Sequence, residues 1–292
     1  MALTSSLQER FRNPEILVAP GAYDAFTARL IEDAGFEAVY LSGAGIAYTS
    51  MATPDLGLIT MTEMVERVTN VCRAIELPLI VDGDTGYGNA TNVIRTVESY
   101  ESAGAAAIQL EDQQFPKRCG HLAGKELVPA EDMVGKIRAA CAARTSSDFL
   151  IIARTDAASV LGLDAAIERG QRYLEAGADV LFVESPASAD ELQAVAEAFP
   201  NTWLMANMVE GGRTPLFSAS ELEAMGYSLV IFPNTLTRRF AYEGQKLLAN
   251  LLAAGTSASQ LDRMFSFNEL NHLMRIEHFE QQERKYLPSP DG

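Results

Sequence analysis

Short apolar runs alternate with longer amphipathic stretches along almost the whole chain, and this alternation limits the fold more than any other feature. The runs are rich in Val, Ile, Leu and Ala and cover 16–19, 38–41, 77–81, 106–110, 149–153, 179–183, 203–206 and 229–232. Most of the gaps hold stretches with helical periodicity, such as 61–75, 130–143, 163–176 and 188–199. Apolar strands that alternate with helices are typical of a parallel sheet buried on both faces. About eight such units in roughly 250 residues predict a (β/α)8 barrel, the TIM barrel of the α/β class.

The last part of the chain extends this repeat. No linker or change of composition divides the sequence, so we expect a single barrel domain over 1–292. Residues 256–292 fall outside the repeat and are amphipathic, which predicts a C-terminal helical extension. A long terminal helix beyond a complete barrel often packs on a neighbouring subunit, so the extension favours an oligomer.

The composition excludes several classes of partner. The formal net charge is −16 and no basic stripe is present, so we expect no binding to nucleic acid. No run approaches the ~18 apolar residues of a membrane span, and the N-terminus lacks a signal core. We therefore expect a cytoplasmic protein that binds no membrane. The cysteines Cys72, Cys119 and Cys141 form no Cys-x-x-Cys pair, which argues against structural zinc.

Polar residues gather where the predicted strands end. In barrels of this type the catalytic groups lie on one rim, at the carboxyl ends of the strands. The residues at or just beyond these ends are Tyr40, Ser42, Asp82, Asp84, Glu111, Arg154, Glu184, Asn207 and Pro233. One polar strand end is ordinary, but this many on one rim predict an active site there.

Three carboxylates on this rim predict a metal site. Asp82 and Asp84 are two residues apart and point the same way if the strand continues, and Glu111 follows the adjacent strand. Close like charges repel unless a cation neutralises them, and Mg²⁺ prefers carboxylates and water. Asp55, from an earlier loop, is in a position to join the cluster. The alternative is a set of turn-forming acids in the glycine-rich loop at 82–88.

A cationic loop with one thiol lies beside these carboxylates. Lys117-Arg118-Cys119-Gly120-His121 falls within a loop at 113–126 that also carries Lys125. Nearby positive charge lowers the pKa of a thiol and attracts anions. We interpret the loop as a lid over an anionic substrate, with Cys119 handling a proton. The alternative is a surface loop with an incidental cysteine.

The rim motifs together resemble the isocitrate lyase/phosphoenolpyruvate mutase superfamily over nearly the whole chain. The matching segments are 40–45, 54–57, 82–88, 111–113, 117–121, 153–156 and 207–215. The lysine–arginine–cysteine lid marks the carbon–carbon lyase branch, since phosphoenolpyruvate mutases usually lack this cysteine. The resemblance implies a (β/α)8 barrel in a homotetramer, a dimer of helix-swapped dimers, and the tail at 258–286 fits that arrangement.

The resemblance also implies a role for each site residue. Mg²⁺, with Mn²⁺ as a substitute, would sit on Asp82, helped largely through waters by Asp84, Asp55 and Glu111. Ser42, Gly43, Ala44 and Arg154 would hold the α-keto-acid half of a small anionic carboxylate. The other half would meet Cys119, Gly120, His121, Glu184 and Asn207. Further substrate contacts are implied for Lys117, Arg118, Thr214, Pro233 and Arg238.

These parts predict a retro-aldol cleavage of a 2-hydroxy acid. The metal favours an alkoxide, and its collapse to a ketone breaks the adjacent C–C bond. His121 and Arg154 would stabilise the enediolate as its charge develops, and Cys119 would then protonate the carbanion. Tyr40 would lie near the substrate hydroxyl as a further catalytic group.

The substrate is predicted from three positions. The 2-methylisocitrate lyases carry an arginine where this chain has Phe267, although Arg238 matches another of their arginines. The segment at 207–215 is more similar to dimethylmalate lyases and plant petal-death-type lyases. Oxaloacetate hydrolases tend to have a serine near the position of Pro233. We expect a substituted malate such as 2,3-dimethylmalate; the alternatives are 2-methylisocitrate cleavage, a phosphonomutase and an oxaloacetate hydrolase.

Overall fold

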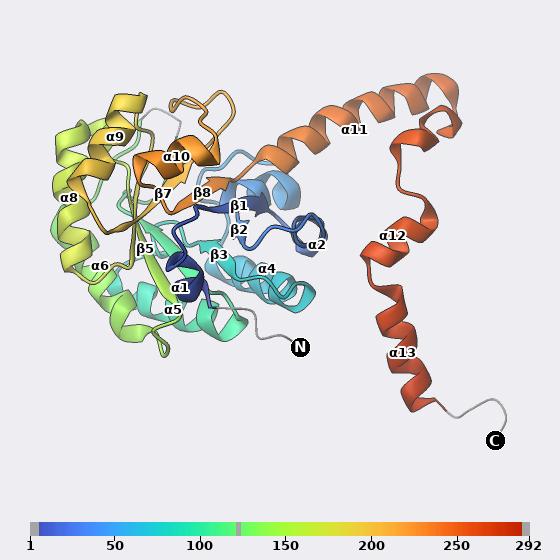
Figure 1. The fold of residues 1–292 in the computed structure, drawn as a ribbon, viewed down its shortest axis with the longest axis horizontal. Helices are drawn as coiled ribbons and strands as arrows, with labels where there is room; N and C mark the ends of the chain where they lie inside the picture. The colour runs from blue at the N-terminus through green and yellow to red at the C-terminus, as the bar shows by residue number, and fades with distance from the viewer. Residues whose placement is uncertain (1–5, 121–123, 288–292) are drawn as a thin grey trace. The chain divides into compact units, whose positions relative to one another are not determined.

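Eight parallel strands close into a barrel in the order of the chain (Figure 1). The structure is a computed structural model that describes residues 6–120 and 124–287. The strands are β1 (Leu17–Ala22), β2 (Val39–Leu41), β3 (Leu79–Asp82), β4 (Ala107–Glu111), β5 (Leu150–Thr155), β6 (Val180–Val183), β7 (Trp203–Asn207) and β8 (Leu229–Phe232). The (β/α)8 barrel predicted from the alternation of apolar runs is confirmed.

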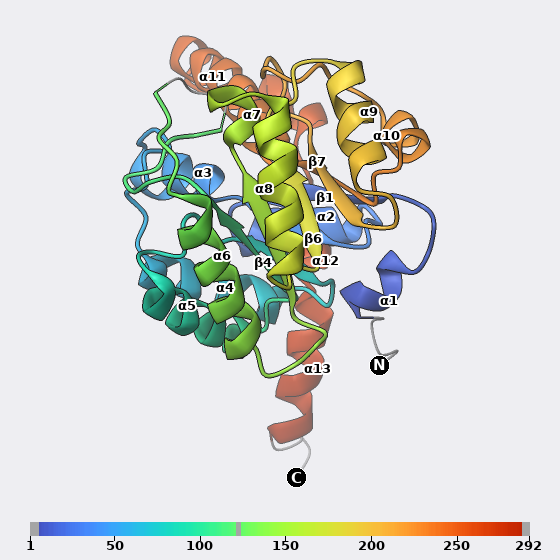
Figure 2. The same cartoon turned by 90° about the vertical axis from the view of Figure 1, so that its left-hand side faces the viewer.

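Helices follow the strands and surround them. The helices of the barrel are α1 (Leu7–Phe11), α2 (Ala25–Asp33), α3 (Gly43–Ile46), the π-helix η1 (Ala47–Met51), α4 (Met61–Ala74), α5 (Ala90–Ala103), α6 (Ala130–Ala143), α7 (Ala157–Val160), α8 (Leu163–Glu175), α9 (Ala189–Ala198) and α10 (Ala219–Met225). Local sequence sets their ends: Thr60 and Glu63 form a capping box at the start of α4, and Gly104 ends α5 in the left-handed region at φ 102°. Figure 2 shows α3 and α7, which follow β2 and β5, at the opposite end of the barrel from α1.

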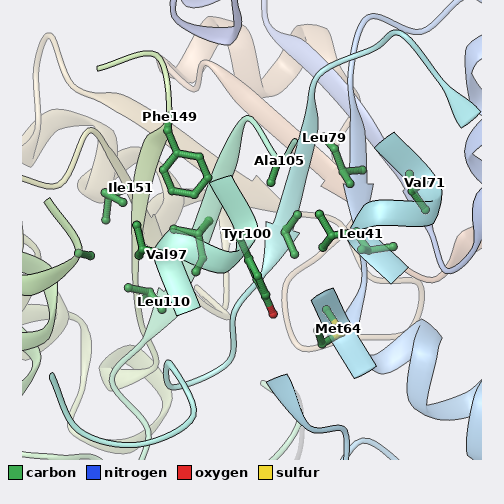
Figure 3. Packing of buried hydrophobic residues seen from close by; sticks show 14 of the residues in the cluster. Leu41, Met64, Val71, Leu79, Val97, Tyr100, Ala105, Leu110, Phe149 and Ile151 are labelled. Atoms are coloured by element: carbon green, nitrogen blue, oxygen red, sulfur yellow. The ribbon is translucent and has the colours of Figure 1, made fainter. Parts of the chain in front are cut away.

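The strands are buried on both faces because their side chains alternate between two cores. Tyr40 and Ile80 point into the barrel, whereas their neighbours Leu41 and Leu79 pack against the surrounding helices. Figure 3 shows part of this outer layer. Phe11 of α1 belongs to the inner core, so α1 contributes to the packing inside the barrel. This double burial explains why the strands read as continuous apolar runs.

The register of the sheet brings the functional ends of neighbouring strands level. Asp82 of β3 pairs with Gln109 of β4, and Glu111 of β4 pairs with Arg154 of β5. All eight strands are parallel, so their carboxyl ends meet on the same rim. The predicted gathering of polar strand ends therefore follows from the register.

The chain divides into two compact units, Met1–Thr237 and Arg238–Gly292. The second unit holds most of α11 (Thr235–Ala254), together with η2 (Ala258–Arg263), α12 (Phe267–Leu273) and α13 (Ile276–Tyr286). The predicted organisation, one barrel domain with an extension at 256–292, stays a prediction. In the described part of the chain, no helix is both long and apolar enough to cross a membrane.

Candidate active site

The acidic side of the rim is organised around a lysine. Lys117 Nζ lies 2.6 Å from Asp55 Oδ1 and 2.7 Å from Asp84 Oδ1, and all three side chains are buried. Asp82 is the last residue of β3, and its Oδ1 accepts a hydrogen bond of 3.1 Å from the backbone N–H of Asp84. The structure therefore brings together Asp55, Asp82 and Asp84, whereas Glu111, the third acid of the predicted cluster, pairs with Arg154. It also shows that Lys117 of the cationic loop inserts its charge among them.

Burial and charge shift the pKa values in this group. Burial is the main cause that raises the pKa of Asp84 from 3.8 to about 6, and Asp82 and Asp55 add to the rise while Lys117 opposes it. Burial alone would lower the pKa of Lys117, but the surrounding aspartates raise it well above its usual value. Lys117 therefore stays charged and neutralises part of the acidic side.

The acidic side has the features of a site for a hard cation. Within 6–120 and 124–287, no three Asp, Glu, His or Cys side chains form a group that could hold a metal ion directly. Yet Gly43 leaves room beside the acids, because a Cβ added there would lie 3.0 Å from Asp82 Oδ2 and 3.7 Å from Asp84 Oδ1. Glu111 Oε1 is buried and accepts no hydrogen bond among the described residues. Carboxylate oxygens in such a place fit a cation that keeps several of its waters, as Mg²⁺ does.

Arg154 organises the opposite side of the rim. Its guanidinium donates to both carboxylate oxygens of Asp156, at 2.9 and 3.0 Å. It also lies 3.3 Å from Glu111 Oε2 and 3.9 Å from Glu184 Oε2. Burial opposes the charged form of Asp156, but the charges of Arg154 and Lys125 outweigh it and lower the pKa of this carboxyl. The guanidinium is thus held in one orientation, which suits recognition of a carboxylate.

A buried acid behind the rim fixes the end of β5. Asp112 accepts hydrogen bonds from Thr155 Oγ1 at 2.7 Å, from the Asp156 N–H at 2.9 Å and from Arg169 at 2.9 Å. It follows Glu111 directly, so successive acids of the same segment serve opposite faces of the strand. Glu111 faces the Arg154 side chain, whereas Asp112 holds the backbone at Asp156, just beyond Arg154.

The cysteine segment, residues 118–120, packs directly on the Arg154 side of the rim. A Cβ added at Gly120 would lie 2.5 Å from Arg154 Nη2 and 2.8 Å from Glu184 Cδ, so only glycine permits this approach. The side-chain amide of Gln113 clamps the backbone N–H and carbonyl of exposed Arg118, at 3.0 and 2.9 Å. Cys119 is half-buried. The prediction for His121 falls outside the described residues.

Tyr40 is linked to Asp82 through an amide. Its hydroxyl donates to Gln109 Oε1 at 3.1 Å, and Gln109 Nε2 donates to Asp82 Oδ1 at 3.4 Å. Burial, reinforced by the charge of Asp82, raises the pKa of Tyr40 well above its usual value. Tyr40 therefore remains protonated and can act on a ligand through hydrogen bonds.

The first turn after β2 presents backbone donors to the rim. Ser42 caps α3 by accepting a hydrogen bond of 3.1 Å from Gly45 N–H, and it donates to Asn234 Oδ1 at 3.3 Å. Gly43 and Ala44 are the first residues of this helix, where the backbone N–H groups have no partner within the helix. This geometry is compatible with the predicted binding of a carboxylate at Ser42, Gly43 and Ala44.

The remaining predicted substrate ligands lie in different places. Asn207 Nδ2 donates to Glu184 Oε2 at 3.1 Å, which joins two of them. Thr214 donates to the Pro186 carbonyl at 2.7 Å and so anchors its loop. Pro233 is buried at the end of β8, and exposed Arg238 belongs to the second unit. The substrate contacts of these residues stay predictions.

Sequence reasoning did not assign three residues that organise the rim: Gln109, Asp156 and Ser185. A signal for Gln109 existed, because an amide in the middle of an apolar strand needs a buried partner. Asp156 stood in the Arg154–Asp156 strand end, but its pairing depends on tertiary contacts. Ser185 stood beside Glu184 at the polar end of the sixth strand without an assigned role, and the structure shows its Oγ donating to Glu184 Oε1 at 2.8 Å.

Comparison with known proteins places this barrel in a family. Residues 7–252 match the model of the phosphoenolpyruvate phosphomutase family. The chain is 47% identical over 290 residues to 2,3-dimethylmalate lyase of Eubacterium barkeri, covering 98% of this chain and 99% of the relative. It is also 47% identical over 266 residues to a probable 2-methylisocitrate lyase of Corynebacterium glutamicum, covering 91% and 87%.

A solved structure agrees with these sequence matches. A crystal structure of 2,3-dimethylmalate lyase superposes with a TM-score of 0.92 at 35% identity, covering 98% of this chain and 95% of the other. The chain therefore belongs to the phosphoenolpyruvate mutase/isocitrate lyase superfamily, as its rim motifs suggested.

Proposed function

We propose that this protein is a carbon–carbon lyase that cleaves a 2-hydroxy dicarboxylate to an α-keto acid and a carboxylic acid. The observation that carries the proposal is the arrangement of one rim, where buried carboxylates, the Arg154 guanidinium and the cysteine segment come together. The 47% identity to 2,3-dimethylmalate lyase, over nearly the full length of both chains, supports a substituted malate as the substrate.

We further propose a dependence on Mg²⁺. Asp82 would hold the ion, with Asp84, Asp55 and Glu111 contributing largely through its waters. When bound, the ion would hold the carboxylate of the substrate and lower the pKa of its 2-hydroxyl group. The space beside Gly43 supports this assignment, as does the Glu111 oxygen that accepts no hydrogen bond within 6–120 and 124–287.

The protein's own residues would act on the two halves of the substrate. Backbone N–H groups at Gly43 and Ala44 would bind the α-keto-acid half. The 2-hydroxyl group would release its proton to water, and its oxygen would form the ketone as the C2–C3 bond breaks. The electron pair of that bond would remain next to the second carboxylate, and the positive charge of Arg154 would stabilise the resulting enediolate. Cys119 would then give its thiol proton to the carbon. Tyr40, held protonated, would orient the substrate hydroxyl through a hydrogen bond.

A substrate panel tests the proposal. The protein is incubated with Mg²⁺ and 2,3-dimethylmalate, 2-methylisocitrate, isocitrate or oxaloacetate; release of the α-keto acid is followed for the first three acids, and release of oxalate for oxaloacetate. We expect the highest kcat/KM with 2,3-dimethylmalate, which would yield pyruvate and propionate. Release of no keto acid from any of these acids, together with formation of a C–P bond in a parallel assay with phosphoenolpyruvate, would overturn it.

A second candidate activity is cleavage of 2-methylisocitrate, favoured by equal identity to a probable 2-methylisocitrate lyase. Phe267, where an arginine would hold a third carboxylate, argues against it. The same panel separates the two. A higher kcat/KM with the tricarboxylate would establish the second candidate.

We also propose that the second unit mediates assembly into a homotetramer. No residue of α11 is buried, and large apolar side chains of this unit are exposed, including Phe240, Leu252, Phe267 and Phe279. Exposed apolar surface of this extent fits a contact with a second copy of the chain. Light scattering of the full chain is expected to give four times the monomer mass, and a monomer would contradict the proposal.

A further inference from the structure

Lys125 is buried although it lies in the cationic loop. Its side chain is only 2% exposed, and its Nζ donates to the Gly120 carbonyl at 2.5 Å and to Asp156 Oδ1 at 2.8 Å. The first acceptor lies beside Cys119, and the second is the partner of Arg154. The charge of Lys125 is therefore committed to contacts within the protein.

The Gly120 carbonyl also lies against the barrel. Ser185, which follows β6 and donates its proton to Glu184 Oε1 at 2.8 Å, places its hydroxyl oxygen 3.3 Å from this carbonyl. The backbone of Gly120 is in turn packed against Arg154 and Glu184, with no room for a side chain. The position of the residue next to Cys119 is thus set by the hydrogen bond from Lys125 to its carbonyl oxygen and by close packing on the guanidinium.

Asp156 completes the link to the barrel. It is fully buried, pairs with Arg154 through both oxygens, and receives the Lys125 ammonium at one of them. Its backbone is held by Asp112. A change at Lys125 would therefore reach the cysteine segment and the guanidinium together, because both are bound to the same ammonium or to its carboxylate partner.

We infer that Lys125 is a positioning residue that holds the Cys119 segment and Arg154 in register through the Gly120 carbonyl and Asp156. The inference rests on the proposed function for the role of Cys119 as proton donor. Small errors in the placement of reacting groups cost large factors in rate, so an ammonium that fixes two of them has a catalytic effect without touching the substrate.

The central experiment measures the reactivity of Cys119 in the full chain without substrate. Lys125→Met removes the ammonium and keeps much of the side-chain volume. We expect iodoacetamide to alkylate Cys119 about tenfold faster, because the segment opens more often once its carbonyl loses the buried donor. Alkylation is followed by mass spectrometry of the peptide that contains Cys119, with Cys72 and Cys141 as internal references.

A kinetic measurement adds a second readout. With the acid that the wild type cleaves best, kcat of Lys125→Met is expected to fall about a hundredfold because the proton donor and the cation lose their register. KM is expected to change by less than about threefold, because Lys125 does not touch the substrate. If Lys125→Met only lost stability, its kcat per folded molecule would equal that of the wild type. This value therefore distinguishes lost positioning from lost stability.

Arg144→Met is the matched control. Arg144 also joins a backbone carbonyl to a carboxylate, Phe149 at 2.9 Å and Asp179 at 2.5 Å, but at the amino ends of β5 and β6. It is expected to lower the melting temperature and leave the alkylation rate of Cys119 unchanged. Equal acceleration in both variants would mean general loosening of the barrel and would overturn the inference.

Two further outcomes decide the matter. A folded Lys125→Met protein whose Cys119 reacts at the wild-type rate would also overturn the inference. Should that variant fail to fold, Lys125→Gln takes its place, because the glutamine amide can still donate to the Gly120 carbonyl. Alkylation of Cys119 in Lys125→Gln is expected to be about threefold faster than in the wild type. Alkylation at the wild-type rate would overturn the inference. If the wild type cleaves none of the acids, the proposed function fails while the alkylation result still stands.

Discussion

The two sides of the rim balance their charges in different ways. On the side of β2 and β3, Asp55 and Asp84 share Lys117, with Asp82 beside them. On the side of β5 and β6, Asp156 binds two cations at once, Arg154 and Lys125. Within the described residues, the first side therefore has one cation for three acids, whereas the second has two cations for Asp156, Glu111 and Glu184 and pairs its charges more closely.

This difference assigns the two sides different tasks. Excess carboxylate with room beside it can accept a further cation, and the charges of Asp82 and Asp55 add to the rise in the pKa of Asp84 that burial causes. A closely paired network has little left to neutralise and instead fixes orientation. We expect perturbations of the first side to change cation binding, and perturbations of the second to change turnover.

The largest effect is expected at the cysteine. Cys119→Ser replaces the thiol by a hydroxyl that gives up its proton far less readily, so kcat should fall about a thousandfold. Because Cys119 lies on the side of Arg154, away from the predicted Mg²⁺ ligands, the affinity for Mg²⁺ measured by calorimetry should remain at the wild-type value. Near-normal turnover would remove Cys119 from the reaction, and loss of Mg²⁺ binding would break the division of the rim.

The next effect concerns stability on the acidic side. Lys117→Met leaves Asp55 and Asp84 buried without their shared cation, which should lower the free energy of unfolding of the metal-free protein by about 3 kcal/mol. Mg²⁺ should then raise the melting temperature of the variant more than that of the wild type, because it supplies the missing charge. An equal rise in both proteins would show that the ion does not replace Lys117 at these acids.

A smaller effect on turnover is expected from Arg154→Lys. Lysine keeps the charge but cannot bind both oxygens of Asp156, so the cation would no longer be held in one orientation. We expect kcat/KM to fall about a hundredfold. The thermal rise on adding Mg²⁺ should match that of the wild type, and a lost response would assign Arg154 to the acidic side instead.

Much of the fold could be predicted from the sequence, and less of the site. The eight apolar runs identified the strands because burial on both faces leaves a continuous signal, and the register then carried Asp82, Glu111 and Arg154 to one rim. The pairing of these groups was not visible. The sequence predicts Lys117 and Lys125 as cations of a lid over an anionic substrate, yet both are buried against carboxylates of the protein itself. Their acceptors, Asp55, Asp84 and Asp156, lie far away in the chain, and only tertiary packing brings them within reach.

The smallest effect is a change in the pH dependence of stability. Asp84 has a folded pKa of about 6 against an ordinary value of 3.8, so between these values the folded protein binds more protons than the unfolded one. The free energy of unfolding therefore decreases as pH rises from about 4 to about 6, and the loss stays constant above that range. Asp84→Asn removes this dependence while keeping the shape of the side chain.

Melting temperatures in the presence of a chelator measure this effect. Asp84→Asn should gain stability relative to the wild type as pH rises from about 4 to about 6, with no further gain at higher pH. A control substitution on the paired side, Asp156→Asn, should behave in the opposite sense, because the pKa of Asp156 is lowered and its charged form stabilises the fold. Parallel curves for Asp84→Asn and the wild type would mean that Lys117 already neutralises the acidic side, leaving no excess charge for a divalent ion to balance.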